Sequence, residues 1–228
     1  MKIALINFSG NVGKTTLARS LFAPRIPAKV YAVESINSDG DEENMVRGRD
    51  FAELQDEMLI EENLVIDVGA SNVEDFLAMM QKFDGANSDI DLFVIPVVPA
   101  AKQQVDSLGT VQQLIELGID KSKLRVLLNQ VELQDDYEKT FARVIAFCEK
   151  IEVKCCHAVV KQNEIYDLLK KSGYSIDDLL GDETDLKAEM KKTEEREEKL
   201  LLARKIAMQR LARGVKIELD DAYKSVVA

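Results

Sequence analysis

The chain has little of what membrane, disulfide-rich and metal-binding proteins require. Its 228 residues include three cysteines, one histidine, four prolines and no tryptophan. No apolar run approaches the roughly 18 residues of a membrane span, and Met1-Lys2 leads into a strand-like segment rather than a signal peptide. The cysteines form no spaced pair, which predicts buried, reduced thiols rather than a metal site; they are Cys148, Cys155 and Cys156. We therefore expect a soluble, cytoplasmic protein without a transmembrane segment.

Basic charge is also scarce. The chain carries 30 lysines and arginines against 41 acidic residues, a formal net charge of −11. Such a balance argues against affinity for nucleic acid over the whole surface and leaves room only for a local basic patch. The length suffices for one sizeable α/β domain and an appendage.

The most informative segment is the run Asn-Phe-Ser-Gly-Asn-Val-Gly-Lys-Thr-Thr at residues 7–16, hereafter the phosphate loop. It follows the apolar residues 3–6 directly. Glycines let successive backbone NH groups approach a polyphosphate, and the helix that follows adds its positive dipole end. Lys14 would neutralise the β and γ phosphates, and the Thr15 hydroxyl would hold Mg²⁺. An ordinary strand-to-helix turn is the alternative, which Gly-Lys-Thr disfavours.

A second candidate lies at residues 64–69, an apolar strand that ends in Asp67, Val68 and Gly69. The carboxyl end of a strand is where α/β folds place their ligands, so Asp67 would bind Mg²⁺ through water. The backbone NH of Gly69 could then contact the γ phosphate. Together with the phosphate loop, this segment indicates a nucleotide site.

Short apolar runs alternate with helical patterns along the chain, which predicts an α/β fold with a mostly parallel, doubly wound sheet. The expected strands cover residues 2–7, 29–34, 64–68, 92–97, 124–128 and 153–160. The expected helices cover residues 14–21, 51–61, 71–83, 102–117 and 135–150. Ser71 and Glu74 have the spacing of a capping box, and Gly118 should end its helix in the left-handed conformation.

The chain changes character after Gly173. Ser175 begins another helix pattern, and residues 185–213 contain no proline or glycine, which predicts one long helix. Residues 199–216 form a basic amphipathic segment that would suit DNA, a membrane face or a protein partner. Packing of its leucines on the sheet is the alternative. We therefore divide the chain into a nucleotide-binding domain, 1–180, and a charged C-terminal helical extension, 181–228.

The phosphate loop departs from the ordinary Walker A pattern, because Phe8 stands where a glycine should precede the lysine by six residues. It resembles instead the deviant Walker A of the ParA/MinD family, typically Lys-Gly-Gly-x-Gly-Lys-Thr. The family's signature lysine, which reaches across a nucleotide-sandwiched dimer, falls on Ser9, and its second glycine falls on Asn11. The nucleotide contacts implied are Ser9, Gly10, Asn11, Val12, Gly13, Lys14, Thr15, Thr16, Gly69 and Asn129.

The resemblance also implies a catalytic set. The family's second strand ends in Asp-x-Asp, whose latter carboxylate positions the attacking water; here Glu34 takes the first place and Ile36 the second. Glu34 or Asp39 could substitute, and a slow or partner-stimulated ATPase fits equally. The expected catalytic residues are thus Lys14, Glu34 and Asp67, with Thr15 and Asp67 on the metal.

Asn129, at the end of an expected strand, falls where the family uses an asparagine to bind adenine. Residues 129–132 also resemble the guanine reader Asn-Lys-x-Asp, but they lack its lysine, which favours ATP over GTP. A turn residue that caps the strand is the alternative reading of Asn129.

The order of these motifs covers about residues 1–180, and with the charged helical tail it looks most like the StbB-type plasmid-stability ATPases of conjugative plasmids. The resemblance implies a P-loop NTPase fold, ATP and Mg²⁺, and a positioning switch for plasmid partition. It also implies a nucleotide-dependent homodimer and a DNA-binding adaptor protein, with direct DNA contact through residues 199–216. The alternatives are a nucleotide-binding scaffold without hydrolysis and a small-molecule phosphotransferase of the same fold.

Overall fold

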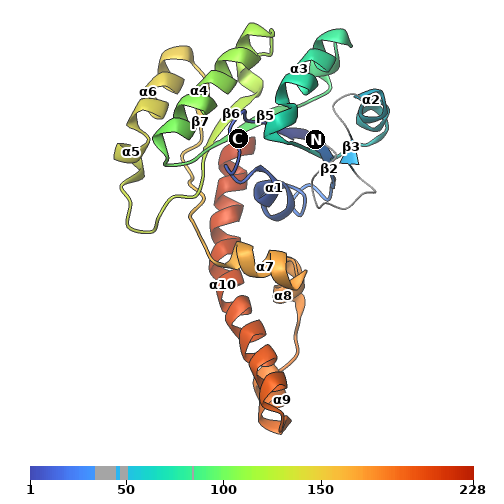
Figure 1. The fold of residues 1–228 in the computed structure, drawn as a ribbon, viewed down its shortest axis with the longest axis vertical. Coiled ribbons are helices and arrows are strands. Elements are labelled where there is room, and N and C mark those ends of the chain that lie inside the picture. Colours follow the sequence, from blue (N-terminus) through green and yellow to red (C-terminus); the bar gives the residue numbers. More distant parts are fainter. Residues whose placement is uncertain (34–44, 47–50, 84) are drawn as a thin grey trace. The chain divides into compact units, whose positions relative to one another are not determined.

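The computed structural model describes residues 1–33, 45–46, 51–83 and 85–228 (Figure 1). Its contacts divide the chain into two compact units. The first is Met1–Gln162 together with Ala222–Ala228, and the second is Asn163–Asp221. The division that the sequence suggested, after residue 180, lies within the second unit and stays a prediction.

The first unit is built on a sheet of parallel strands in the order β3-β2-β4-β1-β5-β6-β7. Their bounds are β1 Lys2–Leu5, β2 Lys29–Val33, β3 Met45–Val46, β4 Leu64–Val68, β5 Leu92–Val97, β6 Leu124–Leu128 and β7 Lys154–Cys155. Strand β1 lies between β4 and β5, so the loop that follows it opens at the carboxyl edge of the sheet, where such folds bind ligands.

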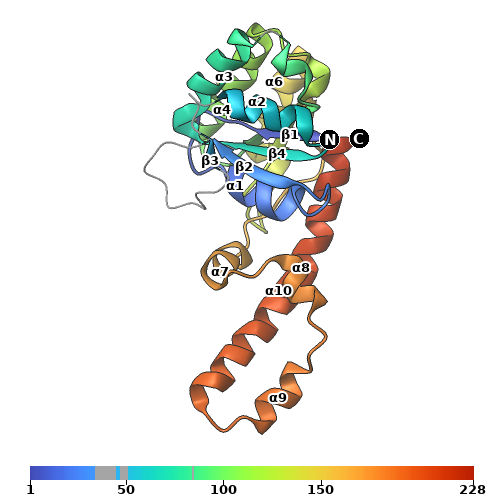
Figure 2. The ribbon, with the colours of Figure 1, turned by 90° about the vertical axis from the view of Figure 1, so that its right-hand side faces the viewer.

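Helices cover both faces of this sheet, as the run of apolar strands predicts. Their bounds are α1 Lys14–Leu17, α2 Phe51–Ile60, α3 Val73–Lys82, α4 Ala101–Glu116, α5 Tyr137–Thr140 and α6 Ala142–Ile151. Helices α2, α3, α4 and α6 lie over one face and α1 over the other (Figure 2). Strands β4 and β5 are buried at every residue because each contributes side chains to both layers. The predicted α/β doubly wound fold is confirmed.

Two local expectations for this unit are tested by its backbone. Helix α4 ends just before Gly118, whose φ of 82° is the left-handed value that was predicted. The capping box at Ser71 was wrong. Asn72 precedes α3 without a side-chain cap, and its amide instead donates to the carbonyl of Val33 at 3.0 Å. Ser71 itself lies inside a short 3-10 turn, Ala70–Asn72, so it is not the residue that precedes the helix.

The last residues of the chain belong to the first unit. Ala222 and Val226 are fully buried, and Arg125 Nε on β6 donates to the carbonyl of Val226 at 2.7 Å. The ring of Tyr223 meets that of Phe22 edge-on, with centroids 6.5 Å apart. The α/β unit is therefore completed by a segment that follows the whole second unit in the sequence.

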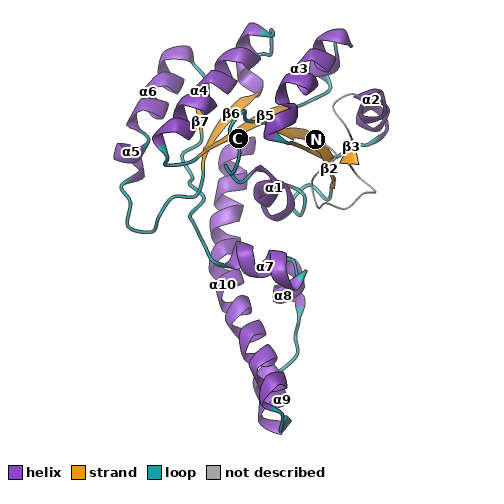
Figure 3. Cartoon of the chain, viewed as in Figure 1, coloured by secondary structure: helices purple, strands orange, loops and turns teal. Residues whose placement is uncertain are grey.

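The second unit is helical throughout its regular structure (Figure 3). It contains α7 Ile165–Ser172, α8 Ile176–Gly181, α9 Leu186–Lys192 and most of α10, which spans Arg196–Val227. The helix start at Ser175 is confirmed as a capping box, in which Asp178 N donates to Ser175 Oγ at 3.0 Å and Ser175 N to Asp178 Oδ2 at 2.8 Å.

The single helix expected over residues 185–213 is two helices. The chain leaves α9 at Thr193, whose ψ is 134° and whose hydroxyl donates to the carbonyl of Glu189 at 3.1 Å. A β-branched residue with such a side-chain bond suits a helix end better than its middle. Helix α10 then runs on beyond residue 213 to Val227. Within the described ranges, no helix is both long and apolar enough to cross a bilayer.

Candidate functional site

The phosphate loop leaves β1 at the carboxyl edge of the sheet and enters α1 at Lys14. The Lys14 side chain is only 7% exposed, and its Nζ donates to the carbonyls of Asn7 at 3.1 Å and Ser9 at 3.2 Å. The ammonium is thus held against the loop itself. A phosphate oxygen would be a stronger partner than either neutral carbonyl, because it adds the attraction between opposite charges to the hydrogen bond.

Gly13 occupies a position that disfavours a side chain. Its φ is 85°, and a Cβ there would lie 2.4 Å from Asn129 Nδ2. Asn11 is also left-handed, with a φ of 58°. Left-handed residues within a loop bend successive NH groups to one side, which makes a concave site for an anion. The glycine that the sequence singled out is therefore favoured by the geometry.

Three side-chain amides hold three consecutive carbonyls of the phosphate loop. The bonds run from Gln103 Nε2 to Gly10 O (2.9 Å), from Gln130 Nε2 to Asn11 O (3.0 Å) and from Asn129 Nδ2 to Val12 O (2.8 Å). In a trans peptide the C=O and the following NH point in opposite directions. Fixing these carbonyls therefore fixes the NH groups of residues 11–13 on the other side of the loop, in advance of any ligand.

A buried asparagine anchors the base of the loop. Asn7 Nδ2 donates to the Pro96 carbonyl at 2.8 Å and to Ser107 Oγ at 2.7 Å, while its Oδ1 accepts from Ser9 N at 2.8 Å. Phe8 N donates to a second hydroxyl of helix α4, that of Thr110, at 3.1 Å. The loop is thus tied to β5 and α4 as well as to its own strand.

Asp67 stands at the carboxyl end of β4, 2% exposed, with Leu5 of β1 and Ala32 of β2 as its neighbours across the sheet. Thr15, one residue into α1, is exposed. Carboxylate and hydroxyl oxygens are the ligands that Mg²⁺ prefers. The oxygens of these two residues are thus of the type that the predicted metal requires, and the metal assignment stays a prediction.

Gly69 is placed differently from what its predicted role needs. Its NH donates to the carbonyl of Val33 at 2.9 Å. A contact between this NH and a γ phosphate requires that bond to open first. The remaining predicted residues, Glu34 together with Ile36 and Asp39, lie outside the described part of the chain.

Sequence reasoning placed residues 9–16 and Asn129 in one site, and the structure brings them together. It did not predict the roles of three side chains, those of Asn7, Gln103 and Gln130. Each acts through a hydrogen bond to a residue about 90 to 120 positions away, which no local pattern reports. The backbone gives one sign of a special role, because the φ of Gln130 is 55°, in the left-handed region. The observed Asn129 amide braces Val12, and its predicted contact with adenine stays a prediction.

The cysteines lie away from this loop and are free thiols. Cys148 and Cys156 are buried, as predicted, whereas Cys155 is partly exposed. Burial raises the pKa of Cys156 to about 11, so its sulfur stays protonated at neutral pH and is a poor nucleophile.

No protein-family model matches the chain, and no curated protein is significantly similar to it. Among solved structures, apo McdA from Cyanothece shares the fold, with a TM-score of 0.50 and 13% identity over 76% of this chain and 90% of that one. A complex of an McdA variant with ATP, also from Cyanothece, gives 0.48 and 13% over 96% of both chains. The MinC:MinD complex from Aquifex aeolicus gives 0.48 and 11% over 75% and 85%.

Proposed function

We propose that this chain binds ATP with Mg²⁺ and hydrolyses it slowly, or when a partner stimulates it, as a nucleotide-dependent positioning switch. The observation that carries the proposal is the preorganised phosphate loop. Three side-chain amides donate to the backbone carbonyls of residues 10–12, which leaves the NH groups of residues 11–13 on the opposite side of the loop. The Lys14 side chain is buried against the same loop. Such an arrangement stabilises a polyphosphate and has no evident use in an ordinary strand-to-helix turn.

The residues would divide the work as follows. Loop NH groups and Lys14 bind the phosphates, and Thr15 and Asp67 hold Mg²⁺, which supplies charge neutralisation when bound. Glu34 is the proposed partner of the attacking water. Asn129 is proposed to contact adenine while it braces the loop, and Gly69 would turn from Val33 to the γ phosphate as part of the switch.

The proposed cellular role rests on the sequence resemblance. We propose a homodimer that forms with ATP, recruits a DNA-binding adaptor and serves plasmid stability or partition in the cytoplasm, in the manner of StbB-type ATPases. Residues 199–216 would contribute direct DNA contact. The shared fold with McdA is compatible with this role and does not specify it.

The nucleotide proposal is tested by Lys14→Ala, with ATP and GTP titrated by calorimetry in the presence of Mg²⁺. Loss of a charge-assisted contact of about 1.5 to 3 kcal/mol predicts an affinity for ATP weaker by roughly tenfold to a hundredfold. Lys82→Ala, at an exposed lysine of α3, is the matched control and should bind normally. Equal affinity of the Lys14 variant and the unmodified chain would refute the assignment.

One observation favours a second candidate, a nucleotide-binding scaffold without hydrolysis. Ser9, at the place of the signature lysine, is 7% exposed, and its backbone is bonded to Asn7 and Lys14. Its short side chain cannot reach across a dimer as a lysine does. Turnover of Mg-ATP, measured alone and with plasmid DNA plus adaptor, separates the candidates. Tight binding with no turnover in both assays supports the scaffold, and phosphate transfer to a metabolite would support a phosphotransferase.

A further inference from the structure

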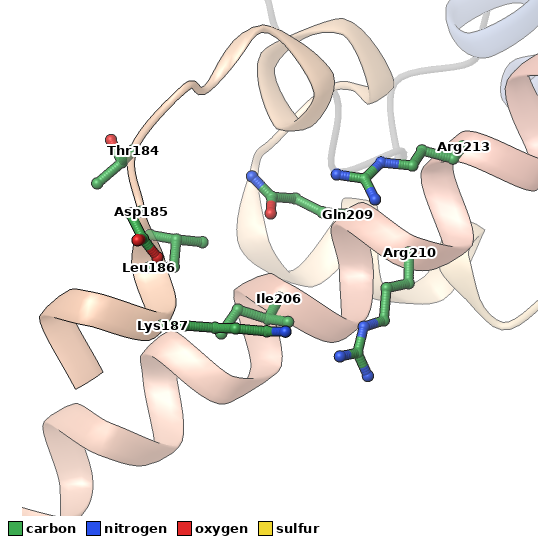
Figure 4. Close-up of a pocket in the computed structure, with 8 residues that line it drawn as sticks. All are labelled: Thr184, Asp185, Leu186, Lys187, Ile206, Gln209, Arg210 and Arg213. Carbon is green, nitrogen blue, oxygen red and sulfur yellow. The ribbon is translucent and has the colours of Figure 1, made fainter. Parts of the chain in front are cut away.

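The second unit contains a cavity of about 210 Å³ where the start of α9 faces α10 (Figure 4). It lies far along the chain from the phosphate loop, and its walls come from this unit alone. The lining residues are Thr184, Asp185, Leu186, Lys187, Ile206, Gln209, Arg210 and Arg213. Three of these eight are cations.

The three cations are Lys187, Arg210 and Arg213, all exposed, and none of them forms an ion pair within the described residues. The one carboxylate in the lining, Asp185, is used as the cap of α9, where its Oδ1 accepts from Ala188 N at 3.0 Å. The neighbouring Asp182 is paired with Lys205 at 2.7 Å. The pocket therefore has a formal charge of +2 in a chain whose total is −11.

The arrangement of these cations is fixed by helix geometry. Arg210 follows Ile206 by four residues and precedes Arg213 by three, so the three side chains share one face of α10. Lys187 extends from α9 towards α10, and Gln209 adds an amide to the same wall (Figure 4). Positive groups from two helices thus line one cavity.

The size of the cavity limits what it can hold. At about 30 Å³ per water in the liquid, 210 Å³ corresponds to roughly seven waters, which is below the 300 to 1,000 Å³ of pockets for drug-sized ligands. A phosphate or diphosphate group fits within this volume. A carboxylate would also fit, but its single charge leaves the pocket positive.

We propose that this pocket binds the phosphate group of a small phosphorylated solute, a site separate from the phosphate loop. Each arginine fork matches a pair of phosphate oxygens, and Lys187 supplies a point charge. A phosphate monoester or diphosphate carries about two or more negative charges, which balances the pocket. A backbone phosphodiester of DNA carries one negative charge and is the poorer match for this pocket, so the DNA contact proposed above would use other basic residues of the segment 199–216.

The test is calorimetric titration of pyrophosphate into the full chain carrying Lys14→Ala, so that the phosphate loop does not contribute. The pocket variant adds Lys187→Gln, Arg210→Gln and Arg213→Gln. The control variant adds Lys191→Gln, Arg196→Gln and Arg204→Gln, which remove the same one lysine and two arginines from exposed positions outside the lining. Saturable binding should weaken at least tenfold in the pocket variant and by less than twofold in the control.

A single substitution tests whether the triple pocket variant loses binding only because it misfolds. Arg210→Lys keeps the charge and loses the fork, so it should bind with intermediate affinity while the helical circular dichroism stays that of the unmodified chain. Acetate should not bind.

The proposal is overturned by absence of pyrophosphate binding in the Lys14→Ala chain, or by equal losses in the pocket and control variants. It is overturned as well if a duplex oligonucleotide, and not pyrophosphate, requires the three residues, since the surface would then be one for nucleic acid. Failure of ATP to bind the unmodified chain bears on the proposed function alone.

Discussion

At the scale of one residue, Gly13 is the position in the phosphate loop where the structure favours glycine most clearly. In Gly13→Ala the Cβ would meet Asn129 and the left-handed φ would be strained, so the free energy of unfolding should fall by at least about 1 kcal/mol and ATP affinity should fall with it. Gly10→Ala is the control for stability, because its Cβ would meet nothing within 4 Å. Urea unfolding of both variants is the measurement, and equal stabilities would contradict the role given to Asn129.

A second residue-scale prediction concerns Gln103, which reaches the loop from α4. Gln103→Met keeps the length of the side chain and removes the NH that Gly10 O accepts, at a cost of about 1 kcal/mol, so ATP affinity should fall roughly fivefold. Gln112→Met, at an exposed position of the same helix, should leave the affinity unchanged. If both variants bind ATP with equal affinity, the hydrogen bonds from the three side-chain amides to the loop do not contribute to ATP binding.

The sequence could predict the residues whose chemistry is local. Lys14, Gly13 and Asp67 were predicted because a loop or a strand end specifies their type, and the structure places them at one edge of the sheet. Gln103 could not be found this way, since an amide that binds a carbonyl 93 positions away leaves no pattern in its own neighbourhood. For Gly69 the local pattern predicted a contact with the γ phosphate, but its NH is hydrogen-bonded to the carbonyl of Val33 on β2.

At the scale of elements, one ion pair fastens the end of α8 to α10. Asp182 Oδ2 lies 2.7 Å from Lys205 Nζ, and both side chains are largely buried, at 17% and 26% exposed. The same ammonium sits 5.2 Å from the centre of the Tyr174 ring. Hydrogen bonds from Lys205 and Thr184 hold the pKa of the Asp182 carboxyl well below its usual range.

A carboxyl with a depressed pKa in the folded state contributes stability above its unfolded pKa of about 3.9, and the contribution is lost as the pH falls towards the folded value. The melting temperature of Asp182→Asn should therefore lie below that of the unmodified chain at pH 6, and this difference in melting temperature should be smaller at pH 3. Thermal unfolding followed by circular dichroism measures both. Asp177→Asn is the control, since its pair with Lys216 is long, 3.5 Å, and exposed. A gap that is constant with pH would contradict the assignment.

Elements were predictable where one chain segment determines them. The strand ending in Asp67 and the cap at Ser175 both came out as expected, because apolar runs and reciprocal caps are local signals. The break at Thr193 was missed, since charged residues with good helix propensity surround it and only the bond to Glu189 marks it. The strand expected over residues 153–160 reduces to β7, followed by one isolated bridge between Val131 and Lys161.

For the whole molecule, the notable feature is that residues 222–228 return to the first unit. A chain that ends at Asp221 loses the buried Val226 and the acceptor of Arg125, so its α/β unit should be less stable by about 3 kcal/mol or more. Urea unfolding checks this, with a chain that ends at Val227 as the control. Equal stability of the two truncated chains would show that the terminal segment packs without consequence.

The same feature determines when the first unit can complete its folding during synthesis. Synthesis proceeds from the amino end, so the phosphate loop leaves the ribosome before the segment that completes its unit. The segment that closes its unit follows the entire helical insertion, at residues 222–228. The part of the first unit that is made earlier therefore keeps apolar surface uncovered until residues 222–228 have been translated. Chaperones can bind that surface during this interval.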